Sequence, residues 1–205
     1  MERAKTDLAA FMFGFAVTLD EADPDHAYKP FPDLPYLRAL VWVWDHYRLM
    51  LVAKSRQLRV TWFFVIAFLH AAAYNDGRQY FFQSKVEEDA DKLLDRAEVV
   101  LSHLPVGLRP VWERKYCQLR FPERNSVIHA VSQSPDAIVS KTASGIFSDE
   151  MSIQPYSRDA FFASLPAIGS TGRYAGAGTP RGQNFFYRIY ADRLDEDTGP
   201  LGVAE

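Results

Sequence analysis

Cysteine is almost absent from this chain of 205 residues, which contains a single one, Cys117. One thiol excludes both an internal disulfide and a zinc site built from cysteines. The pattern of a signal peptide is also missing, because acidic residues rather than a small-residue cleavage site follow the apolar stretch from Phe11 to Val17. Both absences favour an intracellular protein.

Hydrophobic runs of membrane length are missing as well. The apolar run from Val60 to Ala73 is shorter than the ~20 residues that a membrane span requires. It therefore predicts a helix buried inside a protein core.

An excess of positive charge is the third absence. The net charge is −3, so any contact with nucleic acid requires a local basic patch. The segment from Gly107 to Asn125 carries five basic residues against two acidic ones. For such a spacing an ordinary solvated hairpin face is about twice as frequent as a nucleic-acid contact, so both interpretations stay open.

Aromatic residues, in contrast, are plentiful. The chain has 15 Phe, 10 Tyr and 4 Trp, and its hydrophobic fraction is 48%. This composition predicts a globular protein with a bulky core, and the length suits one domain with or without tails.

Hydrophobic periodicity predicts an alternation of helices and strands. The expected helices are Tyr36 to His46, Thr61 to Tyr74, a helix that begins at Ser84 with a Ser84/Glu87 capping box, and Asp159 to Leu165. The expected strands are Leu49 to Ala53, Gln79 to Gln83, the hairpin of Tyr116 to Phe121 with Ser126 to Ser132, Ile138-Val139, Gly145 to Phe147, Tyr174 to Ala177 and Asn184 to Tyr190. The acidic tail from Asp192 is expected to fray. This order of elements predicts an α/β fold with a mainly parallel sheet and helices on both faces.

The turn from Lys54 to Thr61 joins a predicted strand to the long apolar helix. In that context the N–H groups of a loop and of a helix N-terminus converge on an anion, and a Ser or Thr hydroxyl holds Mg²⁺. The usual pattern is Gly-x-x-x-x-Gly-Lys-Ser/Thr, of which only Thr61 is present. Lys54 and Arg59 stand at the glycine positions and Val60 at the lysine position. A positive φ at Arg59 is expected to cost ~1–3 kcal/mol of strain.

Two further segments are expected beside this turn, because ligands of such sheets bind at the carboxyl ends of the strands. Asp149-Glu150 follows the strand that begins at Gly145, and Gly178-Thr179-Pro180 follows the last predicted strand of the sheet. In nucleoside triphosphatases an Asp at such a strand end accepts from Mg²⁺ waters or from the loop Thr, and a following Glu orients the attacking water.

With these segments in this order, the chain resembles the ATPase domain of the large terminase subunit of tailed bacteriophages. The resemblance rests on Lys54 to Leu58, on Gln83-Ser84-Lys85, on Asp149 to Ser152 and on Ala177 to Pro180, over roughly residues 30 to 190. It implies a three-layer P-loop NTPase of the ASCE/RecA-like type. It also implies a phosphate-binding lysine displaced to the start of the loop, which is Lys54 here.

The resemblance implies a site for ATP and Mg²⁺. Lys54, Arg56 and Glu150 take the catalytic roles, Thr61 and Asp149 hold the metal, and Gly178 and Thr179 couple the phosphate state to DNA. The residues implied in nucleotide binding are Lys54, Ser55, Arg56, Gln57, Leu58, Arg59, Val60, Thr61 and Trp62. An adenine-holding segment is expected around Phe31 to Tyr36.

The family often has an Arg-Gly pair that acts on a neighbouring subunit. Val139-Ser140-Lys141 stands in that region here, so Lys141, Arg158 and Arg181 are unranked candidates for the role.

The resemblance also implies an organisation and partners. We expect an N-terminal appendage (1–30), the ATPase domain (31–190) and a tail or linker (191–205). The family's RNase H-like nuclease domain does not fit after Pro180, so an isolated motor domain is expected. The implied partners are double-stranded DNA, the portal protein, the small terminase subunit, a nuclease domain and further copies in a ring. The implied location is the host cytoplasm, without a membrane.

Two other functions remain open. One is a module that binds nucleotide and assists assembly without hydrolysis, since Arg59 and Val60 depart from the usual loop. The other is a helicase-like P-loop ATPase, which requires a second lobe or a partner. The acid at Glu150 separates the first alternative from a motor, because a degraded enzyme has no need to retain it.

Overall fold

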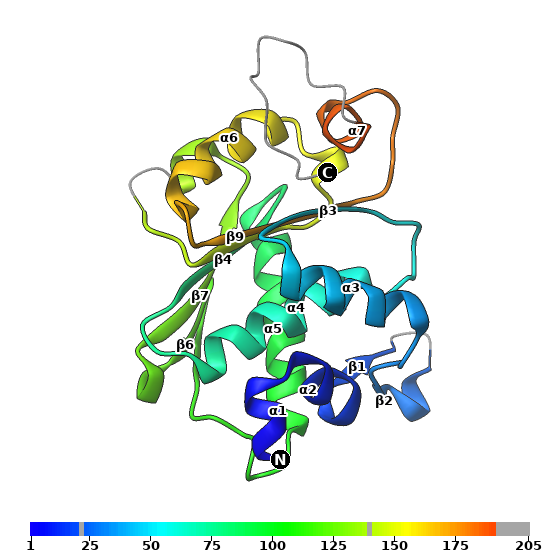
Figure 1. Cartoon of the computed structure of the whole chain (residues 1–205), viewed down its shortest axis with the longest axis vertical. Coiled ribbons are helices and arrows are strands. Elements are labelled where there is room, and N and C mark those ends of the chain that lie inside the picture. The colour runs from blue at the N-terminus through cyan, green and yellow to red at the C-terminus, as the bar shows by residue number, and fades with distance from the viewer. Residues whose placement is uncertain (21–22, 139–140, 192–205) are drawn as a thin grey trace.

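A computed structural model describes residues 1–20, 23–138 and 141–191 of the chain. Its centre is a seven-stranded sheet with the strand order β3-β9-β8-β4-β7-β6-β5 (Figure 1). The first five strands in this order are parallel, and β6 and β5 continue the sheet antiparallel. The strands of the sheet are β3 (Leu49–Ala53), β4 (Gln79–Ser84), β5 (Glu113–Lys115), β6 (Gln118–Phe121), β7 (Ser126–Ser132), β8 (Gly145–Ser148) and β9 (Arg173–Gly178).

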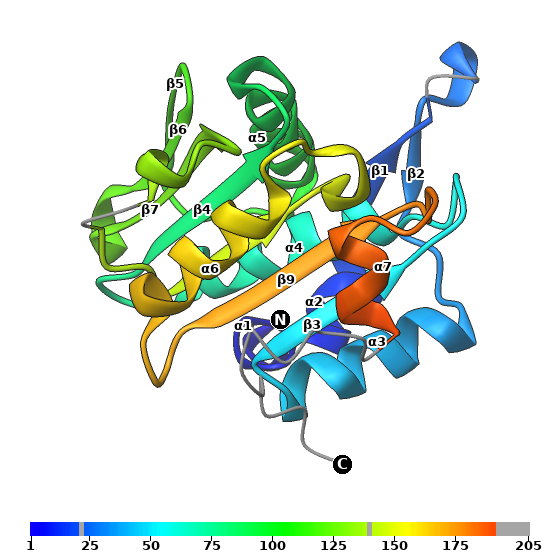
Figure 2. The same ribbon diagram turned by 90° about the horizontal axis from the view of Figure 1, so that it is seen from above.

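Helices cover both faces, which gives three layers. On one face lie α4 and α5 against the sheet, with α1, α2 and α3 outside them, and on the other lie α6 and α7 (Figures 1 and 2). The helices are α1 (Glu2–Thr6), α2 (Leu8–Phe15), α3 (Pro35–His46), α4 (Val60–Tyr74), α5 (Glu87–His103), α6 (Ser157–Ile168) and α7 (Phe185–Tyr190). This confirms the predicted α/β fold with a mainly parallel sheet. Within the described ranges no helix has both the length and the apolar character needed to cross a bilayer.

Helix α4 is apolar on every side because every side is covered. It packs on β4, β8 and β9 and is flanked by α2 and α5. Phe64 and Phe68 contact the ring of Phe147 on β8, with centroids 5.0 and 6.2 Å apart. The polar exception is His70, which bonds the carbonyl of Ala4 at 3.0 Å, and burial lowers the pKa of this imidazole. The predicted buried helix is confirmed.

The amphipathic helix α5 and the hairpin next to it also agree with the sequence pattern. The predicted apolar stripe of α5 is buried, and its acidic residues lie off that stripe. Strands β6 and β7 form the predicted antiparallel pair, with a short 3-10 turn, Pro122–Arg124, between them. The pattern missed β5, which pairs with β6 and extends the sheet by one strand.

Three local predictions are wrong. Ser84 does not begin a helix, because parallel pairing with Ser132 extends β4 through it, and α5 begins at Glu87 without a side-chain cap. The segment from Asn184 to Tyr190 is not a strand but helix α7, since the Asn184 side chain accepts the N–H of Tyr187 at 3.1 Å and caps it. Ile138 ends a short 3-10 turn instead of opening a strand, and Val139 lies outside the described residues.

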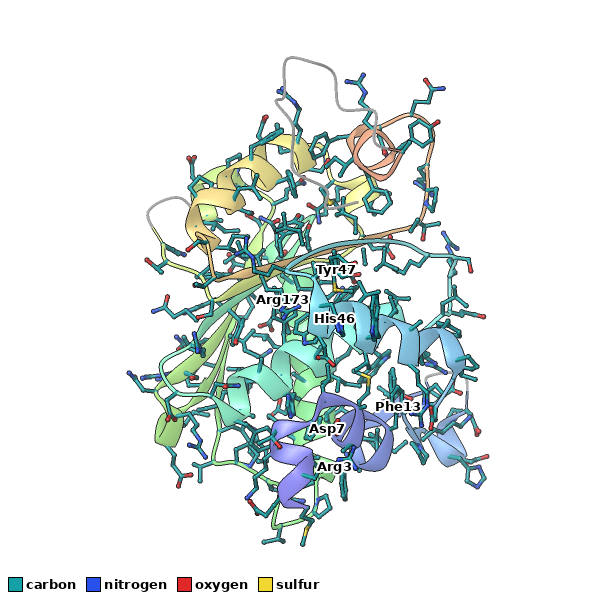
Figure 3. All side chains as sticks on the ribbon, in the orientation of Figure 1. Arg3, Asp7, Phe13, His46, Tyr47 and Arg173 are labelled. Atoms are coloured by element: carbon teal, nitrogen blue, oxygen red, sulfur yellow. The ribbon has the colours of Figure 1, made fainter. Side chains whose placement is uncertain are left out.

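The N-terminal segment packs against the same core as the sheet. Phe11 and Met12 of α2 are fully buried, and Phe11 meets Tyr74 of α4 edge-on at 5.7 Å. Asp7 caps α2 by accepting the N–H of Ala10, an arrangement that lowers its pKa, and it also pairs with Arg3 (Figure 3). The segment continues into a small hairpin of β1 (Val17–Leu19) and β2 (Tyr28–Pro30). The division into 1–30, 31–190 and 191–205 stays a prediction, and most of the last part lies outside the described residues.

Arg173 ties the edge of the sheet to α3. It is the first residue of β9, and its guanidinium lies 4.1 Å from the centroid of the Trp44 ring. It also donates to the carbonyls of Trp44 and Tyr47; Figure 3 labels Arg173 and Tyr47. Burial lowers the pKa of Arg173. These contacts link the C-terminal end of α3 to β9, the neighbour of the edge strand β3.

Candidate functional site

The three segments expected to meet at the carboxyl edge of the sheet do meet there. Strands β3, β9 and β8 are consecutive in the sheet and end at Ala53, Gly178 and Ser148. The N–H of Lys54 donates to the carbonyl of Gly178 at 3.0 Å, which extends the pairing of β3 with β9 by one residue. One strand, β9, therefore separates the strand before the loop from the strand before the acidic pair.

The loop that follows β3 has a strained backbone. Gln57 has φ 66° and Arg59 has φ 57°, in the left-handed region that side chains other than glycine rarely occupy. Arg59 is also the N-cap of α4 and supplies no side-chain cap. The strain expected at Arg59 is therefore present, and Gln57 adds a second strained position that the pattern did not indicate. The N–H groups at the start of α4 form an anion-binding terminus next to this loop.

Lys54 and Glu150 form an ion pair across the site. Lys54 Nζ lies 2.7 Å from Glu150 Oε1, and the lysine side chain is 9% exposed. Glu150 is 36% exposed and has φ 51°, a third strained position. The displaced lysine therefore points at the acidic pair rather than away into solvent.

Thr61 and Asp149 form the second contact. Thr61 Oγ1 donates to Asp149 Oδ1 at 2.9 Å, as expected of a loop Thr and a strand-end Asp. Burial raises the pKa of Asp149, although Lys54 and the Thr61 hydrogen bond act in the opposite direction. The Asp149 N–H donates to the carbonyl of Gln83 at 2.9 Å, and Gln154 donates to the Asp149 carbonyl at 2.7 Å. These backbone bonds fix the carboxylate at the end of β8.

A depression of about 180 Å³ lies over the loop and the start of α4. Its walls are Lys54, Ser55, Gln57, Leu58, Arg59, Val60, Thr61, Trp62 and Arg96. Eight of the nine residues expected to bind nucleotide thus face one hollow. Arg56 is exposed on the loop and is not among these walls. Arg96, from α5, was missed because its helix turn is rich in charge and resembled a solvated face.

Gly178 lies against the acidic segment. A Cβ on Gly178 would stand 2.9 Å from both the N and the Oγ of Ser152, so no larger residue fits without a shift. The carbonyl of Ser152 also accepts from Asn184, at 2.6 Å. Thr179 follows Gly178 and is partly buried. The end of β9 and the residues after Glu150 therefore form one packed unit.

The oxygen donors present suit Mg²⁺. This ion usually takes one or two protein oxygens and completes its shell with water and phosphate oxygens. Thr61 Oγ1 and Asp149 Oδ1 provide such a pair. Clusters of three or more His, Cys, Asp or Glu side chains suited to a metal do not occur within residues 1–20, 23–138 and 141–191.

The remaining candidates lie farther out. Tyr36 of the expected adenine segment donates its hydroxyl to the carbonyl of Leu58 at 3.2 Å, so that segment contacts the loop. Lys141 lies 5.4 Å over the ring of Phe81, and Arg158 lies 5.6 Å over the ring of Phe162. Arg181 is exposed after β9. Val139 and Ser140, the rest of the region compared with an Arg-Gly pair, lie outside the described residues.

The fold and the site geometry together define a class, the three-layer α/β fold of P-loop ATPases. In this fold one strand, here β9, lies between the strand that precedes the loop and the strand that precedes the acidic pair. No family model matches the sequence. The structure, however, is similar to the HK97 bacteriophage large terminase, with a TM-score of 0.71 and 14% sequence identity over 95% of this chain. The match spans 42% of the length of that terminase.

Other solved structures of phage large terminases are also similar to this chain. A variant of the Thermus phage P74-26 large terminase ATPase domain matches with a TM-score of 0.60 and 14% identity, over 78% of this chain and 70% of that one. The large terminase of a thermophilic bacteriophage in complex with ATP-γ-S matches with a TM-score of 0.56 and 14% identity, over 80% of this chain and 43% of that one. The structural neighbours are thus phage large terminase ATPase domains, and the predicted fold is confirmed.

Proposed function

We propose that this chain is the ATP-hydrolysing motor domain of a viral DNA-packaging terminase, which couples hydrolysis of Mg-ATP to translocation of double-stranded DNA into a procapsid. The observation that carries the proposal is the pairing of Lys54 with Glu150 and of Thr61 with Asp149 at one edge of the sheet. Phosphate-loop residues and acidic residues about ninety positions apart in the sequence are within hydrogen-bond distance there. The similarity to terminase ATPase domains supports the same conclusion.

Each side chain has a role that its position supports. The N-terminus of α4 and the loop N–H groups bind the phosphates, and the Lys54 ammonium neutralises phosphate charge from the β3 side of the loop. Arg56, exposed on the loop, is free to turn toward the γ-phosphate. Thr61 and Asp149 hold Mg²⁺, which lowers the charge of the phosphates when bound. Glu150 accepts a hydrogen bond from the attacking water and orients it.

The ion pair of Lys54 and Glu150 gives this assignment an order of events. While Glu150 accepts from Lys54, it is not free to orient water. Phosphate oxygens compete for the lysine, and its departure frees the Glu150 carboxylate at the moment a substrate is present. Gly178 lies against Ser152, in the segment that follows Glu150, and Thr179 comes next in the chain, so the two residues are placed to pass its movement to the rest of the sheet.

The partners follow from the proposed activity. A packaging motor acts on double-stranded DNA, on a portal protein and with a small terminase subunit, a nuclease domain and further copies in a ring. Its location is the cytoplasm of an infected host. Lys141, Arg158 and Arg181 remain the candidates for a residue that acts on a neighbouring copy.

Two alternatives are each supported by one observation. A non-hydrolysing assembly module fits the strained Gln57 and Arg59, which replace the flexible glycines of an active loop. A helicase-like ATPase fits the similarity to a DEAD box protein from Methanococcus jannaschii, which has a TM-score of 0.50 and 14% identity over 74% of this chain. Phosphate release separates the first from a motor, and RNA-stimulated rather than DNA-stimulated turnover supports the second.

The deciding experiment is calorimetry of Mg-ATP binding to the wild-type chain and to Lys54→Ala, with phosphate release followed on the same samples. We expect the wild type to bind and the variant to bind on the order of tenfold or more weakly, because a charge-assisted contact is lost. Arg78→Ala, at an exposed residue just before β4, is the matched loss of a cation. Equal affinity of wild type and Lys54→Ala would remove the lysine from the site, and absence of phosphate release would favour the assembly module.

A further inference from the structure

Arg96 is the one wall of the phosphate-loop depression that comes from neither the loop nor α4. It lies in the third turn of α5 and is partly buried. Its guanidinium lies 5.7 Å from the centroid of the Trp62 ring, and Trp62 is the second residue after Val60, where α4 begins. Stacking on an indole holds the planar guanidinium in one orientation and leaves its N–H groups directed outward.

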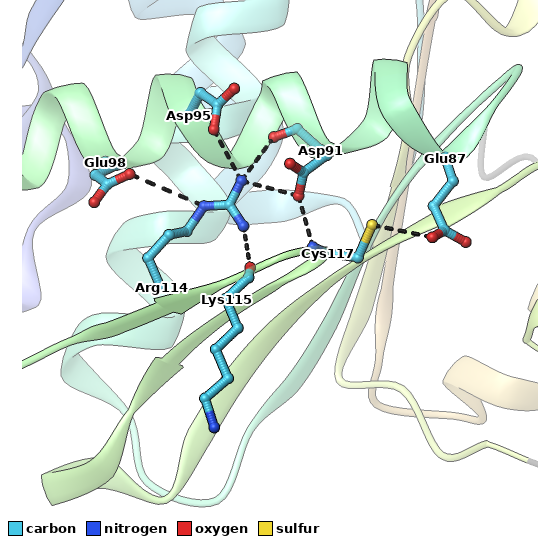
Figure 4. Close-up of polar contacts among 7 residues, drawn as sticks. All are labelled: Glu87, Asp91, Asp95, Glu98, Arg114, Lys115 and Cys117. Atoms are coloured by element: carbon cyan, nitrogen blue, oxygen red, sulfur yellow. Dashed lines mark hydrogen bonds and ion pairs between the residues drawn. The ribbon is translucent and has the colours of Figure 1, made fainter.

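The charge of Arg96 is not neutralised by its own helix. Among the described residues, Arg96 forms no hydrogen bond and no ion pair, and the Trp62 ring is its contact. The carboxylates around it on α5 are engaged elsewhere. Asp91 and Asp95 pair with Arg114 at 2.9 and 2.8 Å (Figure 4). Asp89 pairs with Lys92 at 2.8 Å. The partly buried guanidinium of Arg96, with its five N–H donors, is therefore available to an anion.

Arg96 lines the same depression as Thr61. Asp149 is the residue whose carboxylate bonds Thr61. Arg96 therefore stands close enough to the place of the proposed Mg²⁺-phosphate group to act on it.

A second and larger hollow, of about 520 Å³, shares Arg59, Trp62 and Arg96 with the first. It continues between α5 and the β1–β2 hairpin, where Leu19, Asp20, Lys92, Asp95 and Val99 complete its walls. The guanidinium thus lies at the junction of the two hollows.

We propose that Arg96 binds phosphate oxygens of the nucleotide held at the Lys54–Thr61 loop, as a nucleotide-binding cation supplied by the same chain. The inference rests on the proposed function, because it requires a triphosphate in that depression. Lys54 and Arg96 both line the depression at the start of α4, and the two cations together hold the phosphates there. The contact needs no neighbouring copy, so it exists in the isolated domain.

The test compares Arg96→Gln, which keeps most of the stem and removes the charge, with Lys92→Gln. Lys92 lies on the same helix and lines the larger hollow, but it is paired with Asp89 and is not a wall of the loop depression. Binding of Mg-ATP-γ-S and of Mg-pyrophosphate is measured by calorimetry. We expect Arg96→Gln to weaken both on the order of tenfold and Lys92→Gln to weaken neither by more than about twofold.

Arg96→Lys tests whether binding requires the planar pair of N–H donors of a guanidinium. It also keeps the test decisive if Arg96→Gln does not fold. It retains the charge without the planar pair of donors, so its affinity is expected between those of wild type and Arg96→Gln. Melting temperatures of all variants are recorded without ligand. Wild-type affinity in a folded Arg96→Gln or, if that variant does not fold, in Arg96→Lys overturns the Arg96 assignment and leaves the proposed function standing. Absence of binding to the wild-type chain overturns both, and the wild-type titration alone reveals that case.

Discussion

Two polar clusters of this protein both contain ion pairs and differ in the strain of the backbone that carries them. We call Lys54, Thr61, Asp149 and Glu150 the edge cluster, and Arg114 with Asp91, Asp95 and Glu98 the clasp. In the clasp, Arg114 of β5 contacts three carboxylates of α5 and closes the hairpin onto the helix (Figure 4). Burial opposes the charge, but Asp91 and Asp95 outweigh it and the pKa of Arg114 is raised. The charges of the clasp are paired, although Arg114 Nε lies 4.0 Å from Glu98 Oε2 and has no hydrogen-bond partner.

The edge cluster and the loop beside it have a more strained backbone. Asp149 is buried with a raised pKa, and Gln57, Arg59 and Glu150 all have positive φ. Beside the clasp one residue has a positive φ, Cys117, and its N–H donates to the Asp91 carboxylate at 2.7 Å. Several strained residues at one place indicate a site held ready for a ligand. A cluster with less strain indicates a support for the fold.

The largest expected effect comes from the edge cluster. Glu150→Gln removes the base and keeps the size of the side chain, so we expect turnover to fall by about 10²–10⁴-fold while Mg-ATP affinity stays within a few-fold. Phosphate release and calorimetry on the same preparation measure both. Equal loss of binding and turnover would mean that Glu150 supports the structure, as the clasp residues do.

Arg114→Met tests the clasp. It leaves Asp91 partly buried without its partner, so we expect the free energy of unfolding to fall by about 2 kcal/mol, discounted because Asp95 and Glu98 are largely exposed. The melting temperature is then expected to fall by about 5 °C, with nucleotide affinity unchanged. Arg120→Met, on the exposed side of the same hairpin, is the control. A loss of affinity without a loss of stability would reverse the distinction between the clusters.

Asp149→Asn is expected to separate stability from function within one residue. The raised pKa shows that folding disfavours the charged carboxylate, so a neutral isostere should raise the free energy of unfolding by about 1 kcal/mol. The same change removes an anionic Mg²⁺ ligand, and the Mg²⁺ dependence of nucleotide binding should be lost. Thermal melting without ligand, and titration with and without Mg²⁺, measure the two effects. A destabilised variant would show that Asp149 is as well paired as the acids of the clasp.

The smallest effect concerns DNA. The basic segment from Gly107 to Asn125 is less available than its composition indicates, because Arg114 is held in the clasp and Arg124 pairs with Asp76 at 3.2 Å. Lys115 and Arg120 remain exposed. If this hairpin contacts DNA, Lys115→Gln with Arg120→Gln should lower the slope of log affinity against log salt by about 2. An unchanged slope in a filter-binding or anisotropy titration would place the DNA contact on another surface.

The sequence predicted the parts of the site that depend on local pattern and strand order. The bounds of β3, the buried α4 and the meeting of the loop with Asp149-Glu150 follow from hydrophobic runs and from the rule that ligands bind at carboxyl ends of strands. The positive φ of Arg59 followed from the missing glycine. The functional roles of these residues stay predictions that the experiments above test.

The features that the sequence did not predict depend on contacts between elements that are distant in the chain. Helix α7 is a short aromatic run whose period fits a helix or a strand, and the Asn184 cap decided between them. Arg96 occupies a turn of α5 with two acids nearby, and only the engagement of those acids by Arg114 leaves it free. The sequence of α5 alone does not show that Arg114, on strand β5, pairs with the acidic residues of this helix.

The strand order has a consequence for how the protein is made. Strand β3 stands at the end of the described sheet, and its one partner there is β9, the last strand of that sheet in the sequence. During synthesis the loop strand therefore waits without a partner while β4 to β8 emerge and pair. Lys54 also meets Glu150 only across 96 positions of chain. A half-made chain therefore carries the loop without its acidic partners, and the edge of the sheet is complete only when Gly178 has joined it.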